Sequence, residues 1–438
     1  MTQLRSFLIA VVAGLAIVAP EVLAQSSVAD TLTLADLQAA AVRRDARDRQ
    51  LGLLAGQSRL RSATILADRL PTIVVEGQAQ YQSDVTTFAI ALPGGATVPT
   101  PPHDTYDARL VAQQRVYDPT IAPRLAVENA QLANARAQIV TSLYSPRQNV
   151  SDAFFAALRA QAQLAELETS ITDLEAQLQV ASARVRQGAA LPSEELTIRA
   201  ELLRRRQAVA EWAANRRATL SVLADLTGAR IDSGLALSEP SVAAAVTRVR
   251  TDIDGMRTRP EYQQFAAARD LLQRQEAARA AMDKPRVSLF GRLGYGRPGL
   301  NALSTSFDAY WLTGVQLQWS PWTWGTSRRD REVISLQRQI VTADEAAFSA
   351  SLRRAVTQDV ASIDRLAAAL ATDDEIIDLR ERVLVETRAR YREAVINSAE
   401  YVDRQTDVLA ARITRALHRI ELAQFRAHFL TTLGIEVR

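Results

Sequence analysis

The sequence has no cysteine, only three histidines and a single lysine, Lys284, so 51 of its 52 basic residues are arginine. Without cysteine the chain cannot carry a disulfide framework, a thiolate metal site, a cysteine nucleophile or a lipidated N-terminal cysteine. The 52 basic and 49 acidic side chains nearly cancel and leave a net charge of +3. A dedicated nucleic-acid-binding protein gathers an excess of basic residues on one face, so we expect no nucleic-acid partner.

Motifs for catalysis are equally scarce. The chain has no Gly-x-Ser-x-Gly motif and no glycine-rich phosphate loop before its lysine. Residues 294–299 match the glycine spacing of a dinucleotide site, but they precede a polar stretch instead of a helix, so we interpret them as a flexible hairpin loop. His418 and His428 lie ten positions apart on one predicted helix and do not stack as a metal pair. We therefore expect no enzyme activity, no cofactor and no metal site.

The first 24 residues have the features of a secretory signal peptide. Arg5 is followed by an apolar run of twelve residues (7–18), by the helix breaker Pro20 and by a cleavage pattern ending at Ala24. A membrane-anchoring helix is the alternative, but the run is shorter than the roughly 20 residues needed to span a bilayer. No later stretch approaches that length. We expect an exported chain that crosses a membrane, if it does so, as β-strands.

The rest of the chain is a tandem duplication. Residues 183–188 (Ala-Arg-Val-Arg-Gln-Gly) resemble residues 389–394 (Ala-Arg-Tyr-Arg-Glu-Ala), and Glu194 has its counterpart in Glu400 at the same offset (400 − 194 = 206). Self-similarity of this kind indicates a repeated structural unit. After the signal peptide (1–24), we divide the chain into a first repeat (25–228), a connector (229–259) and a second repeat (260–438).

Each repeat is predicted to contain a helix, a β-hairpin, a very long helix, a tight turn and a final helix. In the first repeat, the helix, two strands, long helix, turn and final helix are predicted at 33–66, 72–82, 106–117, 120–187, 188–193 and 194–227. In the second repeat they are predicted at 260–282, 287–295, 309–319, 326–393, 394–399 and 400–433. Pro146 is expected to kink or split the first long helix.

Apolar and polar side chains alternate along the predicted strands. In the first strand, Ile73, Val75 and Tyr81 lie on one face, whereas Glu76 and Gln78 lie on the other. Segments of about ten residues with this pattern are typical of outer-membrane strands, although a soluble hairpin with one wet face shows the same alternation. Aromatic residues near the predicted strand ends match the girdles of membrane barrels. These residues are Tyr81, Tyr106, Tyr295, Trp311 and Trp319.

Four strands cannot close a barrel, because membrane barrels begin at about eight strands and an open edge in lipid leaves backbone groups unpaired. Several chains would therefore have to pool their strands. The helix at 120–187 would be roughly 100 Å long at 1.5 Å per residue, and apolar residues such as Leu167 and Leu174 repeat with heptad spacing. These helices predict antiparallel coiled coils. A periplasmic coiled-coil scaffold whose hairpins never enter lipid is the alternative of another class.

The arrangement resembles the TolC family of outer membrane efflux proteins over nearly all of the mature chain. The resemblance rests on the duplicated hairpins, on an aromatic-rich strand end (319–322) that runs into a basic helix (328–329), and on the turns that follow 184–188 and 390–394. It implies a trimer of mainly α-helical chains. Four strands from each chain would contribute to a shared 12-stranded barrel, and long antiparallel coiled-coil helices would form an α-barrel across the periplasm. The connector 229–259 would lie in an equatorial belt.

The same resemblance assigns roles at the two turns. A periplasmic tip would dock an adaptor protein through Gly188, Ala189, Ala394 and Val395. Beyond the tip, Glu400 and Asp403, with Glu194 as their counterpart in the first repeat, would narrow the tunnel. Three copies of a carboxylate around an axis form a ring that favours cations and raises the carboxylate pKa values. Alternatively, Glu400 and Asp403 are solvated first-turn acids that stabilise a helix N-terminus.

This resemblance therefore implies a passive exit duct of a tripartite efflux pump in the outer membrane of a Gram-negative bacterium. Its expected partners are two further copies of the chain, a periplasmic adaptor, an inner membrane transporter reached through that adaptor, and outer membrane lipid. Small molecules are the expected cargo. Type I protein secretion or metal export is the alternative, although the chain lacks the histidine- or methionine-rich tracts that would favour metal export.

Overall fold

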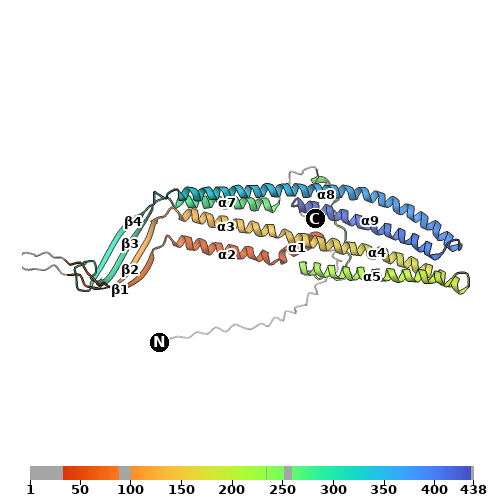
Figure 1. Cartoon of the computed structure of the whole chain (residues 1–438), viewed down its shortest axis with the longest axis horizontal. Helices are drawn as coiled ribbons and strands as arrows, with labels where there is room; N and C mark the ends of the chain where they lie inside the picture. The colour runs from red at the N-terminus through yellow and green to blue at the C-terminus, as the bar shows by residue number, and fades with distance from the viewer. Residues whose placement is uncertain (1–32, 88–99, 233, 251–258, 436–438) are drawn as a thin grey trace, which may run out of the picture.

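The computed structural model describes residues 33–87, 100–232, 234–250 and 259–435, and the predicted signal peptide lies outside these ranges. The described chain is long and narrow (Figure 1). A four-stranded sheet forms one end, and helices run from it to two turns at the opposite end. The predicted class, mainly helical with four strands, is confirmed.

The helices follow the predicted series in both repeats. Their bounds are α1 (Leu34–Arg44), α2 (Ala46–Ala67), α3 (Ile121–Ser142), α4 (Tyr144–Arg186), α5 (Pro192–Thr227), α6 (Ala243–Val249), α7 (Pro260–Ala281), α8 (Thr326–Arg392) and α9 (Ser398–Thr432). The 67 residues of α8 run without a break and span roughly 100 Å at 1.5 Å per residue.

Two helices predicted as single segments are divided. The helix predicted at 33–66 is interrupted at Asp45, whose backbone is extended and whose carboxylate accepts a hydrogen bond from the Arg47 backbone N–H. Asp45 therefore acts as an N-cap that starts α2 afresh. The helix predicted at 120–187 is divided at Leu143, between α3 and α4. Proline fits the first turn of a helix but not its interior, so this break places Pro146 in the first turn of α4.

Two antiparallel helix pairs make up the half of the molecule that lies away from the sheet. Helix α4 packs along α5 and α8 packs along α9, and the two pairs meet through α4 and α9 (Figure 1). Nearer the sheet, α2 packs on α3, α3 on α7, and α7 on α8. These four helices form a layer in the order α2-α3-α7-α8, so α2 and α8 are its outer members.

The main hydrophobic core lies where the two helix pairs converge. Phe154 of α4, Leu223 of α5, Leu366 of α8 and Phe429 of α9 are fully buried there, and Val246 of the short connector helix α6 packs against them. Each such side chain stabilises the fold by about 1.5–3 kcal/mol, so this cluster fixes the two repeats together. Among the described helices, none combines the length and the hydropathy needed to cross a membrane.

The sheet consists of β1 (Thr72–Tyr81), β2 (Asp104–Tyr117), β3 (Arg286–Arg297) and β4 (Asp308–Gln318), all antiparallel and in the order β1-β2-β3-β4. Each repeat contributes one hairpin, and β2 joins β3 across the repeats. Within the described residues β1 and β4 are therefore edge strands, each paired on one side.

Part of the segment predicted as a flexible loop is ordered strand. Residues 294–296 pair with both β2 and β4, so the loop interpretation of 294–299 is wrong at its start. A Cβ on Gly294 would come within 2.4 Å of the Tyr310 ring, and one on Gly296 would come within 2.7 Å of the Tyr106 carbonyl oxygen. The glycines are therefore explained by close approach to the neighbouring strands.

Candidate channel wall and helix tip

The register of the sheet collects the alternating side chains of all four strands on common faces. Val75, Leu110, Leu293 and Trp311 form one row of the apolar face, and they are 80%, 41%, 60% and 72% exposed. Burying apolar surface is worth about 25 cal/mol per Å². A contiguous apolar face left this exposed indicates a surface that is covered by another apolar phase or partner.

The aromatic residues of the apolar face follow a diagonal across the sheet. Tyr81 of β1, Tyr106 of β2, Tyr295 of β3 and Trp311 of β4 are each displaced by two residues from the one on the preceding strand. At about 3.4 Å per residue and 4.8 Å between strands, a displacement of one to two residues corresponds to a strand tilt of about 35–55°. Membrane strands tilt by about 35–45°, and only even displacements keep side chains on one face. If the strands are tilted in this way, the four aromatic residues of the diagonal would lie at one height, parallel to the membrane plane.

The fifth predicted girdle residue lies at the other end of the sheet. Trp319 directly follows β4 and is 56% exposed, and its indole Nε1–H donates to the Asp283 carbonyl oxygen at 3.1 Å. It is eight residues beyond Trp311, which in strands tilted by about 45° corresponds to a height difference of about 20 Å. The apolar band of an outer-membrane barrel is about 25 Å tall. The two aromatic levels are therefore separated by nearly the thickness of such a band.

The opposite face of the sheet carries a cluster of polar side chains that are paired with one another. Arg109 donates to Glu76 Oε2 at 2.6 Å and to Asp107 Oδ2 at 3.1 Å, and the Tyr310 hydroxyl donates to Asp107 Oδ1 at 2.6 Å. These residues come from β1, β2 and β4. A face of this kind suits contact with water, as in the lumen of a channel.

The two turns at the far end of the helices have the same geometry. Gly188 (φ 70°) and Ala394 (φ 59°) both adopt the left-handed conformation. The backbone N–H of the next residue, Ala189 or Val395, donates to the carbonyl oxygen five positions back at 2.8 Å or 2.9 Å, which closes each helix in a Schellman motif. All four residues predicted to dock an adaptor are exposed. The alanine in the second repeat therefore keeps the turn of the first.

The three acidic residues predicted to narrow the tunnel do not share one environment. Glu400 and Asp403 are exposed on α9, where the Asn397 side chain caps the Glu400 backbone N–H at 3.0 Å. Neither carboxylate has an ion pair within the described ranges. Glu194 instead is half-buried, and its Oε2 has no hydrogen-bond partner among the described residues. It lies near Tyr391 of the second repeat.

A buried pair of tyrosines joins the helix ends at the tip, and the sequence reasoning did not identify it. Tyr391 of α8 and Tyr401 of α9 are fully buried and stack with ring centroids 5.3 Å apart. The Arg184 guanidinium of α4 lies 5.5 Å from the centroid of the Tyr391 ring and donates to the Tyr391 carbonyl oxygen at 3.0 Å. Burial, assisted by the charge of Glu194, raises the pKa of Tyr391 to about 12. The available signal was that a tyrosine replaces Val185 of the first repeat.

A second buried contact joins the helix pairs further from the tip. Arg205 of α5 is 2% exposed, and it donates to Glu201 Oε1 at 2.8 Å, to the Thr406 hydroxyl of α9 at 3.2 Å and to the Ser170 hydroxyl of α4. Burial acts to raise the pKa of Glu201, but hydrogen bonds from Arg204 and Arg205 outweigh it and hold the pKa below its ordinary value. Arg205 therefore links three helices through one guanidinium group.

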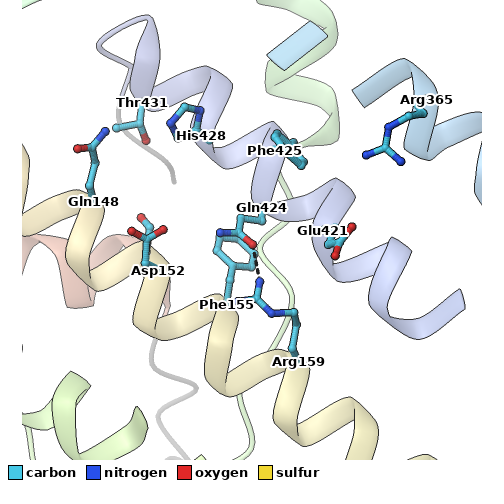
Figure 2. Close-up of a pocket in the computed structure, with 11 residues that line it drawn as sticks. Gln148, Asp152, Phe155, Arg159, Arg365, Glu421, Gln424, Phe425, His428 and Thr431 are labelled. Atoms are coloured by element: carbon cyan, nitrogen blue, oxygen red, sulfur yellow. Dashed lines mark hydrogen bonds between the residues drawn. The ribbon is translucent and has the colours of Figure 1, made fainter. Parts of the chain in front are cut away.

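A cavity of about 720 Å³ lies between α4 and α9. Figure 2 shows Asp152, Phe155 and Arg159 on α4 facing Gln424 and His428 on α9. Arg159 crosses the cavity and donates to Gln424 Oε1 at 2.6 Å. The cavity therefore lies between the first repeat and the second.

His428, at the edge of this cavity, also contacts α8. Its Nδ1 lies 2.9 Å from Oδ2 of the buried Asp359, and the Thr432 hydroxyl donates to the same oxygen at 3.3 Å. The hydrogen bond with Asp359 outweighs burial and raises the pKa of His428, with further attraction from Asp152 of α4 and opposition from Arg259. The histidine therefore connects α9 to α8 by a charge-assisted hydrogen bond when it is protonated.

The other helical histidine is paired in the same way. His418 Nδ1 lies 2.6 Å from Oδ2 of Asp373 on α8. Each histidine is thus paired with a different aspartate of α8, and the two histidines do not contact one another. Within the described ranges, no group of three or more histidine, aspartate and glutamate side chains is arranged to hold a metal ion.

Comparison with known proteins identifies the fold. No protein-family profile matches the sequence, and no curated protein matches it. Among solved structures, CusC has 15% sequence identity and a TM-score of 0.68, with 92% of each chain covered. VceC, an outer membrane protein of Vibrio cholerae, has 14% identity and a TM-score of 0.65, covering 92% of this chain and 97% of its own. The open MtrE outer membrane channel of Neisseria gonorrhoeae has 17% identity and a TM-score of 0.64, covering 92% and 89%.

These structures are named as channels or outer membrane proteins, and none is named as an enzyme. The chain therefore has the fold of TolC-like outer membrane channels, and the predicted resemblance is confirmed at the level of the fold.

Proposed function

We propose that three copies of this chain form an outer-membrane channel whose helices continue across the periplasm as the passive exit duct of a tripartite efflux pump. The observation that carries this proposal is an open four-stranded sheet with one exposed apolar face, joined to a helix, α8, that is roughly 100 Å long. The solved outer membrane channels of the same fold support this setting. We assign the chain no catalytic activity.

The sheet edges are the reason for more than one copy. In lipid, each unpaired backbone group costs several kcal/mol, so the β1 edge of one copy would pair with the β4 edge of the next. Two copies would supply eight strands, whose interior is filled by side chains. Three copies would supply 12 strands and leave a lumen lined by the polar face that carries Glu76, Asp107 and Arg109.

The outer helices of the layer expose apolar stripes that support the same closure. On α2, which leads into β1, Leu53 and Leu60 are 72% and 71% exposed. On α8, which follows β4, Val333, Leu336 and Ile340 are 52%, 54% and 60% exposed. Because α2 and α8 lie on opposite sides of the layer, the α2 stripe of one copy would cover the α8 stripe of its neighbour. This head-to-tail contact closes into a ring.

The tip would dock a periplasmic adaptor, through which an inner membrane transporter supplies the energy. Small, exposed residues allow close approach of a partner, and Val395 adds an apolar side chain that is 61% exposed. The proposed docking residues are Gly188, Ala189, Ala394 and Val395.

Glu400 and Asp403 would form the selectivity ring of the duct. Both are exposed, neither is neutralised within the described ranges, and their spacing places them on one helix face. Around a threefold axis the carboxylates would concentrate negative charge in the duct, which favours cations. Glu194 would contribute less to the lumen, because it is half-buried beside Tyr391.

The proposed cargo is small molecules, as in an efflux pump. Type I protein secretion or metal export would use the same duct. A wall that only encloses the path needs no recognition pocket, so the cargo would be selected by the inner membrane transporter.

Single-channel recording in planar bilayers tests the proposal. We expect cation-selective current steps from the detergent-extracted oligomer, and a loss of selectivity in the Glu400→Ala/Asp403→Ala variant. Asp364→Ala is the control, because this exposed acid on α8 is paired with Arg250. An ion selectivity unchanged by the double variant would show that Glu400 and Asp403 only stabilise the N-terminus of α9. Properly oligomeric protein that never inserts, and that carbonate washes from membranes, would instead be a periplasmic scaffold.

A further inference from the structure

An aromatic surface lies where β4 passes into α8. Trp322 and Trp324 are 73% and 80% exposed, and their rings meet edge to face with centroids 5.8 Å apart. Trp319 fixes the start of this segment through its hydrogen bond to Asp283. The chain has only five tryptophans, and three of them lie within these six residues. Large aromatic side chains gathered in solvent indicate a surface that is covered by a partner.

Two arginines adjoin the aromatic surface. Arg328 and Arg329 are exposed in the first turn of α8. Arg329 donates to the Trp324 carbonyl oxygen at 3.2 Å, which joins the basic and aromatic parts of the surface. Arg328 has no hydrogen bond or ion pair within the described ranges. No acidic residue occupies this turn, so both charges oppose the helix dipole. The Asp283 carboxylate accepts a hydrogen bond from the Ser327 hydroxyl in the same turn and offsets part of this charge. Arg328, which has no partner within the described ranges, remains available to a partner outside the chain.

Further basic residues lie at the same end of the sheet. Arg69 precedes β1, and Lys284 and Arg286 lie at the start of β3. Arg69 and Lys284 have no ion pair within the described ranges. Arg115 of β2 is neutralised by Asp68 and Asp118, and Asp118 also attracts Arg286. The boundary between strands and helices is therefore electropositive.

We propose that this surface binds the periplasmic leaflet of the outer membrane, with Trp322 and Trp324 at headgroup level and Arg328 and Arg329 on the phosphates of anionic phospholipids. The inference rests on the proposed function, because the sheet must span the membrane for the surface to lie at its boundary. Tryptophan is enriched at membrane interfaces, and basic residues next to a membrane attract anionic lipids. The guanidinium fork of arginine matches a phosphate group.

The vertical position of the surface agrees with this assignment. Trp319 lies about 20 Å from the level of the Tyr81-to-Trp311 diagonal when the strands are tilted by about 45°. Trp322 and Trp324 follow it directly and precede the periplasmic helices. The surface therefore continues the apolar face of the sheet at the end where the chain leaves the membrane.

The test uses the full trimer in vesicles of phosphatidylcholine and phosphatidylglycerol, with bromine atoms carried by one lipid or by the other. Bromine quenches tryptophan on contact, so the two quenching curves give the relative affinity for the anionic lipid. We expect phosphatidylglycerol to be preferred, and the Arg328→Gln/Arg329→Gln variant to lower that preference by about fivefold per arginine. Arg353→Gln/Arg354→Gln removes an exposed arginine pair from the middle of α8, and this control should leave the preference unchanged.

Four results would overturn the inference. Equal quenching by both lipids, or a preference that survives in the Arg328→Gln/Arg329→Gln variant, would show that this surface does not select anionic lipid. Channel currents from the same vesicles would still support the proposed function. Displacement of phosphatidylglycerol by inorganic phosphate would show an ion site instead of a bilayer surface. Failure of the trimer to insert into either vesicle would overturn both the inference and the proposed function.

Discussion

Tyr391 and Tyr401 stack at the helix tip with their ring planes 19° apart, and Glu194 lies near the Tyr391 hydroxyl and Arg388 near the Tyr401 hydroxyl. They lie on either side of the second turn, so their contact holds α8 against α9 where the chain reverses. Arg184 of α4 covers the Tyr391 ring. The tyrosine pair therefore also connects the first repeat to the second at the end of the molecule.

Ionisation of Tyr391 should loosen the tip at high pH. Its pKa is raised to about 12 from an ordinary value of 10.0. Because the folded-state pKa is the higher one, the stabilisation is complete below pH 10 and is lost as the pH rises towards 12. We expect protease cleavage near residues 390–400 to increase over this range in the native chain but not in Tyr391→Phe. If Tyr391→Phe shows less tyrosinate absorbance than the native chain at pH 10, Tyr391 is already ionised at that pH, and this account is contradicted.

The two tip turns offer a matched pair of glycine and alanine substitutions. Gly188→Ala should destabilise the first turn by about 1 kcal/mol, because a left-handed conformation is unfavourable for a residue with a Cβ. No atom lies within 4 Å of that Cβ position, so the effect is conformational and not steric. Ala394→Gly should stabilise the second turn by somewhat less, since glycine also gains entropy in the unfolded chain.

Amide hydrogen exchange at each turn measures both effects. Exchange should become faster around residue 188 in Gly188→Ala and slower around residue 394 in Ala394→Gly. A change of the same sign in both variants would contradict the shared turn geometry.

Removal of the Arg205 side chain should weaken the contact between the helix pairs. Arg205→Ala loses charge-assisted hydrogen bonds to Glu201 and the links to Ser170 and Thr406. Arg204 still holds Glu201, so we expect a loss of about 1.5–3 kcal/mol in thermal or denaturant unfolding. Arg204→Ala is the control.

The Arg204 side chain is 67% exposed, and exposed ion pairs contribute at most about 1 kcal/mol. Arg204→Ala should therefore have the smaller effect. Equal losses in the two variants would show that the buried guanidinium does not join the helix pairs.

Stability near the α8–α9 core should depend on pH through His428. Its raised pKa means that the stabilisation is complete below the ordinary value of 6.5 and is lost as the pH rises through the folded-state value. The side chain is 46% exposed, so water screening limits the effect to about 1 kcal/mol. The melting temperature should fall as the pH rises above the ordinary histidine value of 6.5 in the native chain, and this fall should be smaller in His428→Asn.

His103→Asn provides the control for this titration, because His103 lies in the exposed loop end and contacts the Gln82 carbonyl oxygen. It should leave the pH dependence unchanged. A native-like pH dependence in His428→Asn would assign the effect to another group.

Much of the fold could be predicted because its strand and helix patterns of apolar residues repeat over long segments. The strand alternation of residues such as Ile73 and Val75 and the heptads around Leu167 and Leu174 specify element type and buried face. Pro146 marks a break in the first long helix, although the position of that break depends on local backbone geometry at Leu143. Asp45 was missed as an N-cap because it lies in a mostly charged stretch (43–50) that also suits the exposed face of one continuous helix.

The contacts at the tip could not be predicted in the same way. Helical periodicity indicates which face of a helix is buried but not which side chain of another helix lies opposite. From the sequence, Arg205 is therefore expected to be a solvated arginine, and Tyr391 and Tyr401 are expected to be ordinary helix residues. The conformation of Ala394 was equally hidden, because alanine gives no signal for a left-handed turn.

Disulfide crosslinking between neighbouring copies tests the central claim most directly, since the native chain has no cysteine. Gly77→Cys on β1 would be combined in turn with Trp311→Cys, Thr313→Cys or Val315→Cys on the same face of β4. The account predicts that one pairing gives a covalent ladder that ends at three chains in outer-membrane fractions, while each single-cysteine variant stays at one chain. A ladder that ends at two, or membrane-inserted protein that never crosslinks β1 to β4, would contradict it.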